Sequence, residues 1–304
     1  MKNVLRVVAG IYTVALLVAL LATSCAFPDS TIELNESNNN GYDPAINTLL
    51  TKTSVRLFDG VKKSDVTLTF EGQVEKLSAS LSQKYGRSVG ATEKLPITSE
   101  DISALIEEQL TKLNIPELIE PSSGDIALIN KDFPDLSEED TIAELETIQK
   151  VYQNQVGSLV FNAIIANPDY QPESSISRAT GYNDGAFYYD DTQVTVYEIG
   201  AALLHAFSAV TLSQQREKAF QLTEKYMGAK DRTDDKSDAF RHAILNIVMA
   251  KEGWGLKGEK MAWARDFSTA HEKGVKYTGI PSEMDLHNNN VGLGITTQNL
   301  PRNI

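Results

Sequence analysis

The chain has little of several residue types on which enzymes and secreted proteins commonly rely. It contains one cysteine, Cys25, and four histidines in 304 residues. A single cysteine cannot form a disulfide within the chain, so an extracytoplasmic fold would be stabilised by its hydrophobic core alone. The G-x-S-x-G, H-E-x-x-H and P-loop spacings are also absent. The sequence therefore offers no serine-hydrolase elbow, zinc-peptidase helix or P-loop.

Basic residues are also scarce. The chain has 28 Lys and Arg against 41 Asp and Glu, which gives a formal net charge of −13. Binding to phosphate backbones requires clustered Lys and Arg. We therefore expect no nucleic-acid partner, and an anionic lipid surface is disfavoured for the same reason.

The one long apolar run lies in the first 25 residues. The run covers residues 7–22. Lys2 and Arg6 precede it, and the small residues Thr23 and Ser24 separate it from Cys25. A basic start, a compact apolar stretch and a small-residue end are typical of a secretory signal. A cysteine at this point resembles the lipid acceptor of bacterial lipoproteins, although Ala22 stands where leucine is usual.

This resemblance implies that residues 1–24 are a lipoprotein signal peptide and that Cys25 carries the lipid. The protein would then be extracytoplasmic and anchored to a bacterial membrane. An uncleaved signal anchor and a cleaved signal with a free Cys25 are the alternatives. Residues 25–50 are polar and rich in Asn, which predicts a flexible tether between lipid and folded protein.

The remaining pattern predicts a mainly α protein. We expect a small mixed α/β or helical N-terminal region over residues 51–130, with a short hairpin around Asp59-Gly60. A multi-helix domain would follow over residues 131–304. Its last helices are expected at residues 194–210, 213–227, 236–252, 259–273 and 282–291. Four glycines stand where helices would end, the preferred C′ position: Gly228, Gly253, Gly274 and Gly292.

All four histidines lie in the last third of the chain, three of them in polar motifs. In Ser237-Asp238-Ala239-Phe240-Arg241-His242-Ala243, the spacing i, i+4, i+8 places Asp238, His242 and Asn246 on one helix stripe. A carboxylate one turn before an imidazole can fix its tautomer. His205 stands alone on an apolar helix and is interpreted as a core histidine with satisfied hydrogen bonds.

Two further motifs follow. In Phe267-Ser268-Thr269-Ala270-His271-Glu272, the spacing places His271 on the apolar face, so we expect its ring to point inward. In the stretch from Glu283 to Gly292, Glu283 and His287 are one helical turn apart. The amides of Asn289 and Asn290 can each hydrogen-bond through both ends. Short loops separate these helices, so the three motifs could converge.

The order D-A-F-R-H-A, A-H-E, M-D-L-H-N-N-x-x-G resembles a bacterial domain family of unknown function. That family occurs in secreted and lipid-anchored proteins and in the C-terminal modules of toxin-like proteins. The resemblance covers about residues 194–295 and implies no established activity. The matching positions are Asp238, Arg241, His242, His271, Glu272, Asp285, His287, Asn288, Asn289 and Gly292.

Three interpretations of these residues stay open. The first is a metal-dependent hydrolase, with a divalent ion such as zinc held by His242, His271, His287 and Glu272. Against it, no pair of histidines is spaced to give two ligands from one helix. The second is metal-free acid–base catalysis with a candidate catalytic set of His242, Asp238, Arg241, His287 and Asp285. The third is a buried structural network, supported by Asn246, Asn288 and Asn289, in a non-catalytic binding or scaffold module.

Overall fold

The computed structural model describes residues 41–170, 193–228, 236–274 and 280–297. For residues 280–282 it describes the backbone alone. Cys25, the expected signal peptide and the first part of the expected tether lie outside these residues. Within them the chain is mainly helical, as the sequence predicts, with thirteen helices and one two-stranded sheet. None of the described helices combines the length and apolar composition needed to cross a bilayer.

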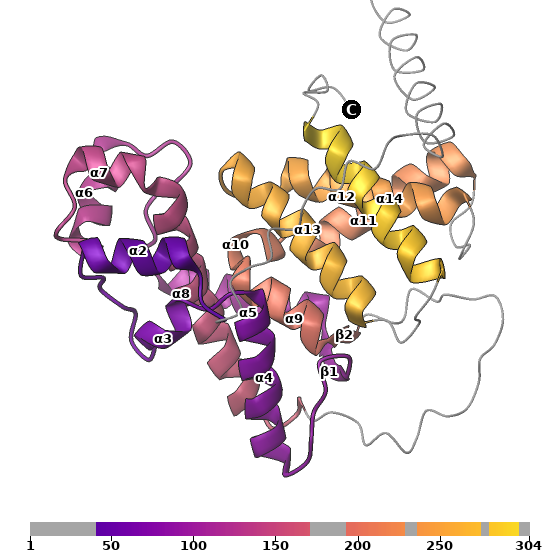
Figure 1. Cartoon of the computed structure of the whole chain (residues 1–304), viewed down its shortest axis with the longest axis horizontal. Coiled ribbons are helices and arrows are strands. Elements are labelled where there is room, and N and C mark those ends of the chain that lie inside the picture. Colours follow the sequence, from indigo (N-terminus) through magenta and orange to yellow (C-terminus); the bar gives the residue numbers. More distant parts are fainter. Residues whose placement is uncertain (1–40, 171–192, 229–235, 275–279, 298–304) are drawn as a thin grey trace, which may run out of the picture.

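The elements follow one another along the chain as shown in Figure 1. The helices are α2 (Pro44–Lys52), α3 (Lys63–Val66), α4 (Phe70–Tyr85), α5 (Ser99–Lys112), α6 (Ser123–Asp132), α7 (Glu138–Ala143), α8 (Leu145–Ala166), α9 (Val196–Leu204), α10 (Ala206–Ala209), α11 (Leu212–Met227), α12 (Lys236–Glu252), α13 (Lys257–Gly274) and α14 (Ile280–Thr297). The strands are β1 (Lys94–Thr98) and β2 (Gln193–Thr195).

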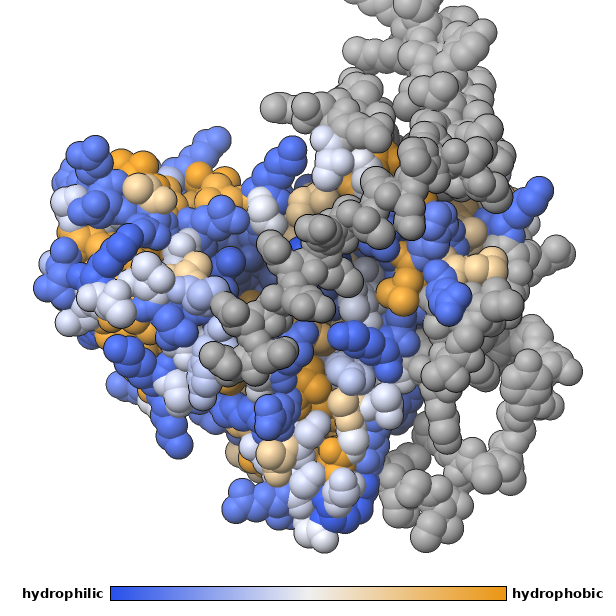
Figure 2. Space-filling model, in the orientation of Figure 1, coloured by the Kyte–Doolittle hydropathy of each residue, from blue (hydrophilic) through white to orange (hydrophobic). Residues whose placement is uncertain are grey.

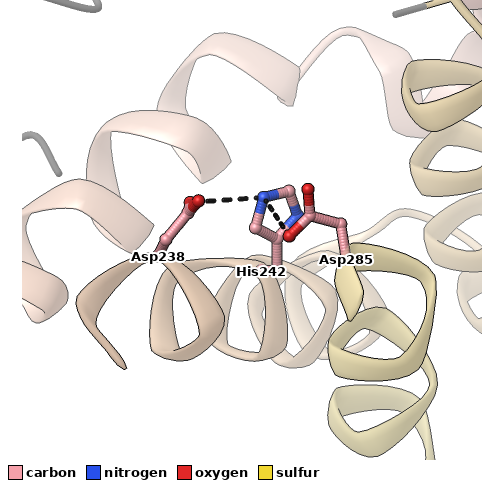
Figure 3. A group of neighbouring side chains, drawn as sticks. All are labelled: Asp238, His242 and Asp285. Atoms are coloured by element: carbon pink, nitrogen blue, oxygen red, sulfur yellow. Dashed lines mark ion pairs between the residues drawn. The ribbon is translucent and has the colours of Figure 1, made fainter. Parts of the chain in front are cut away.

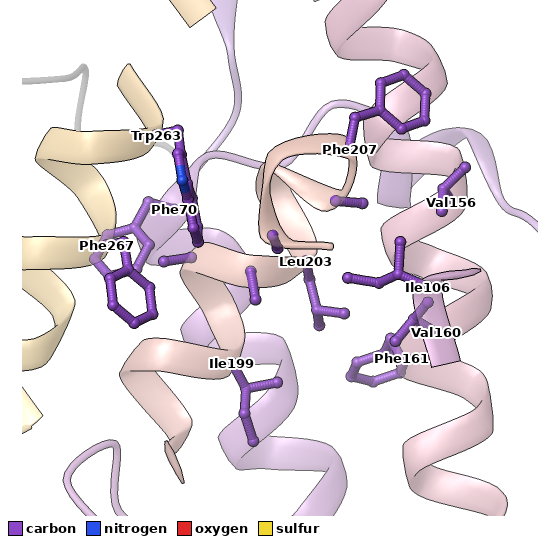
Figure 4. Packing of buried hydrophobic residues seen from close by; sticks show 14 of the residues in the cluster. Phe70, Ile106, Val156, Val160, Phe161, Ile199, Leu203, Phe207, Trp263 and Phe267 are labelled. Atoms are coloured by element: carbon purple, nitrogen blue, oxygen red, sulfur yellow. The ribbon is translucent and has the colours of Figure 1, made fainter. Parts of the chain in front are cut away.

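Helix α9 lies at the centre of the fold. It packs against α4, α8 and α13, and its aliphatic residues from Val196 to Leu203 are buried. The approach of α8 depends on Gly157, where an added Cβ would lie 2.0 Å from the Leu203 carbonyl oxygen. Figure 4 shows side chains from α4, α5, α8, α9, α10 and α13 meeting in this core.

The small sheet joins segments that are far apart in sequence. β1 and β2 pair antiparallel, with Lys94 opposite Thr195. Each strand leads into a helix through a capping box: Thr98 with Asp101 at the start of α5, and Thr195 with Glu198 at the start of α9. These reciprocal hydrogen bonds satisfy backbone N–H groups that a helix start otherwise leaves unpaired. The sheet therefore fixes where α9 begins.

The last four helices form a layer around α12, which contacts α11, α13 and α14. A second apolar cluster lies between α11 and α12: Ala219, Phe240, Ile244, Ile247 and Val248. On the face shown in Figure 2, hydrophilic residues cover most of the described surface, and apolar patches are small and separate.

Several sequence-based expectations about local structure are wrong. No hairpin forms around Asp59-Gly60, because the second expected strand is taken up by α3 and the start of α4. The expected tether ends early, since α2 begins at Pro44 and buries Ile46, Leu49 and Leu50. Helix α6 runs through the expected boundary at residue 130, and one apolar cluster extends from Ile46 to Leu293.

The C-terminal helices also differ from expectation at two points. The expected helix over 194–210 is broken at His205, which separates α9 from α10. Gly228 does cap α11 with a left-handed backbone, φ 68°. Gly292 does not end a helix. It lies inside α14, where the absence of a Cβ lets the helix approach Ala243 of α12.

Candidate functional site

Three side chains from two helices converge at the start of α12. Asp238 and His242 stand one turn apart on α12, and Asp285 reaches them from the first turns of α14 (Figure 3). The Nε2 atom of His242 lies 3.4 Å from the Oδ1 atoms of Asp238 and of Asp285. Within the described ranges, this is the one group of three or more His, Cys, Asp or Glu whose ligand atoms all lie within 4.8 Å of one another.

The other ring nitrogen of His242 faces a third carboxylate. Its Nδ1 lies 3.4 Å from Glu272 Oε1 near the end of α13. Burial favours the neutral ring, but the hydrogen bond with Asp238 and the negative charges of Glu272 and Asp285 outweigh it. The pKa of His242 therefore lies above its ordinary value. Both nitrogens of this imidazole are thus engaged by carboxylates.

Two buried asparagine side chains, Asn246 and Asn289, form hydrogen bonds that lead to Glu272. Asn289 of α14 donates from Nδ2 to Glu272 Oε1 at 3.3 Å, and its Oδ1 accepts a 2.8 Å hydrogen bond from Asn246 Nδ2. Asn246 also donates to the backbone carbonyl of His242 at 3.0 Å. Helices α12, α13 and α14 are therefore joined by polar contacts directly behind the imidazole.

The site is open on one side. The side chain of Asp285 is 20% exposed and that of His242 is 13% exposed, whereas Asp238 is 5% exposed. Arg241 forms an ion pair with Asp238 and lies with its guanidinium carbon 5.3 Å from the centre of the Phe220 ring. The arrangement is a mostly buried polar cluster in which Asp285 is the most exposed carboxylate.

His271 and His287 lie outside this group. His271 does not point inward. Its side chain is 46% exposed, and its Nδ1 lies 2.9 Å from Glu198 Oε1. The neighbouring Glu272 faces the protein interior instead, since Ala270 and Glu272, on either side of His271 in sequence, are both buried. His287 is exposed and Asn288 is half-buried. The set of three imidazoles expected to bind metal is therefore not assembled.

The contact with His271 has a clear electrostatic consequence for Glu198. Burial raises the pKa of this carboxyl. The hydrogen bond and charge of His271 and a backbone hydrogen bond at Thr195 outweigh burial and lower the pKa to about 2. Glu198 is also the capping-box residue of α9. This pair therefore stabilises the start of the central helix.

His205 lies in a second, largely buried polar cluster, of which the sequence predicted only the buried histidine. Its Nδ1 lies 2.5 Å from Glu259 Oε1 and its Nε2 lies 3.0 Å from Asp266 Oδ2, both on α13. Burial lowers the pKa of His205, yet the two carboxylates raise it to about 9. Helical spacing could have identified these two partners of His205, because Glu259, Trp263 and Asp266 lie on one face of α13.

Comparison with known proteins covers the region that contains both clusters. Residues 199–303 match the model of a family described as a domain of unknown function (DUF6973). No curated protein and no solved structure gives a significant match to the chain. The match begins within α9 and includes every residue of the polar site around His242. The C-terminal third of this chain is therefore similar to an uncharacterised family, as its motifs suggested.

Proposed function

We propose that this chain is a lipid-anchored extracytoplasmic protein whose C-terminal helices carry a divalent-metal-dependent hydrolase site. The ligands would be Asp238, His242 and Asp285. The observation that carries the proposal is the convergence of their three ligand atoms at the open edge of α12 and α14.

The spacing of these atoms fits a small divalent ion. Zinc binds imidazole nitrogen and carboxylate oxygen at about 2.0–2.2 Å in tetrahedral geometry, so neighbouring ligand atoms should be about 3.4 Å apart. His242 Nε2 lies 3.4 Å from each of the two carboxylate oxygens. One imidazole and two carboxylates also suit manganese or magnesium.

The residues around the ligands have the arrangement that metal sites use. A metal-ligating histidine commonly directs its second nitrogen to a carboxylate, which fixes its tautomer and orientation. Glu272 occupies that position at His242 Nδ1, and Asn289 holds Glu272 in turn. The partial exposure of Asp285 leaves a side from which water and substrate can enter.

A bound divalent ion would supply Lewis-acid activation of water and of an electrophilic oxygen. The chain's own residues would orient the site: Glu272 holds the proton on Nδ1 of His242, and Arg241 places a positive charge beside Asp238. Metal-free base catalysis by His242 is less well supported, because both ring nitrogens already face carboxylates and neither offers a free lone pair to solvent.

A second candidate is a non-catalytic module in which the same residues are structural. The buried contacts of Asn246, Asn289 and Glu272 favour it, because such networks specify how helices pack. The two candidates differ in their response to metal. A cation that binds the folded state alone stabilises it by about 2.7 kcal/mol at a concentration 100 times its Kd.

Thermal unfolding of the full-length chain separates them. After treatment with EDTA, added zinc or manganese should raise the midpoint in a saturable manner. Asp285→Asn should abolish the rise, whereas Glu283→Gln, which removes an exposed charge from the same helix, should retain it. Metal-loaded protein would then be screened against ester, phosphoester and peptide substrates, with the same two variants as controls.

If no divalent ion raises the midpoint of the wild-type chain, the hydrolase proposal fails and the structural network remains. If ions bind but Asp285→Asn responds like the wild type, the ligand assignment fails. A chain that binds metal at Asp285 but hydrolyses no substrate class would be a cation-dependent binding module.

The anchor is tested separately. The basic start, apolar run and Cys25 support a lipoprotein signal. Cys25→Ser should move the protein from the membrane fraction to the soluble fraction and abolish metabolic labelling with palmitate. Retention of label or of membrane association in this variant would contradict lipidation at Cys25.

A further inference from the structure

An apolar groove lies at the opposite end of α12 from the polar site. It has a volume of about 640 Å³ and lies between the end of α5, α10 and the connection from α12 to α13. Small-molecule sites are about 300–1,000 Å³ and are lined mainly by apolar side chains. The apolar residues of this groove include Leu110, Leu113, Ile115, Phe207, Val210 and Trp254.

The aromatic part of the groove is held in place by the backbone. Phe207 and Trp254 meet edge to face, with ring centroids 4.5 Å apart. The Ser208 hydroxyl donates to the Trp254 carbonyl at 3.0 Å and accepts from the Trp254 N–H at 3.1 Å. The groove is therefore preorganised on this side, which lowers the entropic cost of binding.

The polar groups that line the groove are unequally satisfied. Glu252 forms an ion pair with Lys218, and Glu117 accepts a hydrogen bond from the backbone N–H of Ile119 at 2.7 Å. Lys260, at the α13 side, has no ion pair or hydrogen bond from its ammonium group within the described part of the chain. The groove thus combines apolar walls with one half-buried cation, Lys260, whose ammonium group forms no ion pair with any residue that the structure describes.

We propose that this groove binds a single-chain amphiphile with an anionic head, a fatty-acid carboxylate. Its tail would lie along the aliphatic and aromatic walls, and its carboxylate would pair with Lys260. A neutral apolar ligand would leave Lys260 without a counter-ion in a partly desolvated position, and a cationic head would be repelled by it.

The groove is independent of the polar site. Ten residues of α12 separate His242 from Glu252 at the groove rim, a rise of about 15 Å at 1.5 Å per residue. Ligand binding here therefore does not require the proposed metal site, and failure of one proposal leaves the other standing.

Laurate titrated into the full-length chain below its micellar concentration tests the proposal. The chain has two tryptophans, and Trp263 is fully buried, so Trp254 should report binding by a saturable fluorescence change. Trp254→Phe should remove that signal while calorimetry still detects binding. Lauryl alcohol should bind more weakly than laurate, and dodecyltrimethylammonium should bind most weakly.

Lys260→Gln should raise the Kd for laurate about tenfold, the loss expected for one charge-assisted contact, and leave the Kd for lauryl alcohol unchanged. Lys257→Gln is the matched control, because Lys257 is exposed one turn earlier on α13 and does not line the groove. Val210→Trp should fill the groove and abolish binding of every probe.

The proposal is overturned if laurate shows no saturable binding to the full-length chain, as it would if another segment of the protein fills the groove. It is also overturned if Lys257→Gln weakens laurate as much as Lys260→Gln, or if the cationic amphiphile binds as tightly as laurate. Binding of all probes by Val210→Trp would show that the ligand lies elsewhere.

Discussion

Replacing Gly292 by alanine tests how closely α14 must approach α12. A Cβ at this position would lie 2.3 Å from the carbonyl oxygen of Ala243 and 3.0 Å from its carbonyl carbon and Cα. These are backbone atoms of a packed helix, so no side chain can rotate away. The clash is relieved only if the two helices separate by about 1 Å, since ordinary contacts of this kind need more than 3 Å.

The magnitude follows from two opposing effects. Overpacking of this kind costs about 1–3 kcal/mol, and contact with backbone favours the upper end of that range. Alanine is favoured over glycine inside a helix by about 1 kcal/mol. Gly292→Ala should therefore lower the free energy of unfolding by about 2 kcal/mol. Because Asp285 lies two turns away on the same helix face, outward movement of α14 should also weaken cation binding at the proposed metal site.

Gly294→Ala provides the matched control. It lies on the same helix, where an added Cβ would meet nothing within 4 Å. This variant should therefore be as stable as the wild type or more stable, by up to about 1 kcal/mol. Urea unfolding of both variants measures the difference. If Gly292→Ala is at least as stable as Gly294→Ala, α12 and α14 do not pack as described.

Three further predictions address the buried polar and close-packed positions. Because the pKa of His205 is raised to about 9 in the folded state against about 6.5 in the unfolded chain, its contribution is complete below pH 6.5 and is lost as pH rises through 9. Urea unfolding between pH 6 and pH 10 should show a loss of at most about 3 kcal/mol, and a flat profile would contradict the charged pairing with Glu259. Asn289→Leu should cost about 1–3 kcal/mol in the same assay, whereas exposed Asn290→Leu should be nearly neutral. Gly157→Ala should cost about 2 kcal/mol or more, since its Cβ would meet the Leu203 backbone; wild-type stability would refute that contact.

The fold class could be predicted from sequence because most helices carry their own signals. The spacing of four residues predicts the stripe of Asp238, His242 and Asn246. In the structure His242 lies 3.4 Å from Asp238, and Asn246 donates to Asn289 of α14. The start of α2 was missed because a polar, Asn-rich stretch leads directly into it. Only the tertiary burial of Ile46 and Leu49 shows that this helix belongs to the core.

The role of Gly292 could not be predicted from local sequence. Glycine after a helical pattern is typical of a C-cap, and that interpretation is confirmed at Gly228. Glycine is also required where two backbones meet, and nothing near Gly292 in sequence reveals Ala243 as its neighbour. Choosing between these two uses requires the tertiary partner. The same limit applies to His205, whose two carboxylate partners lie more than fifty residues away.

The third motif shows how much of the site helical periodicity alone can supply. The spacing of Glu283 and His287 indicates a polar pair on one helix face, but both residues lie on an exposed face of α14. The spacing i, i+4, i+7 joins Asp285, Asn289 and Gly292, and each of these contacts or approaches α12 or α13. One face thus provides the carboxylate at His242, the amide behind it and the gap that lets α14 approach. The α14 part of the polar site and the close helix packing therefore share one helix face, so a variant at Gly292 should disturb the site without removing any of its polar side chains.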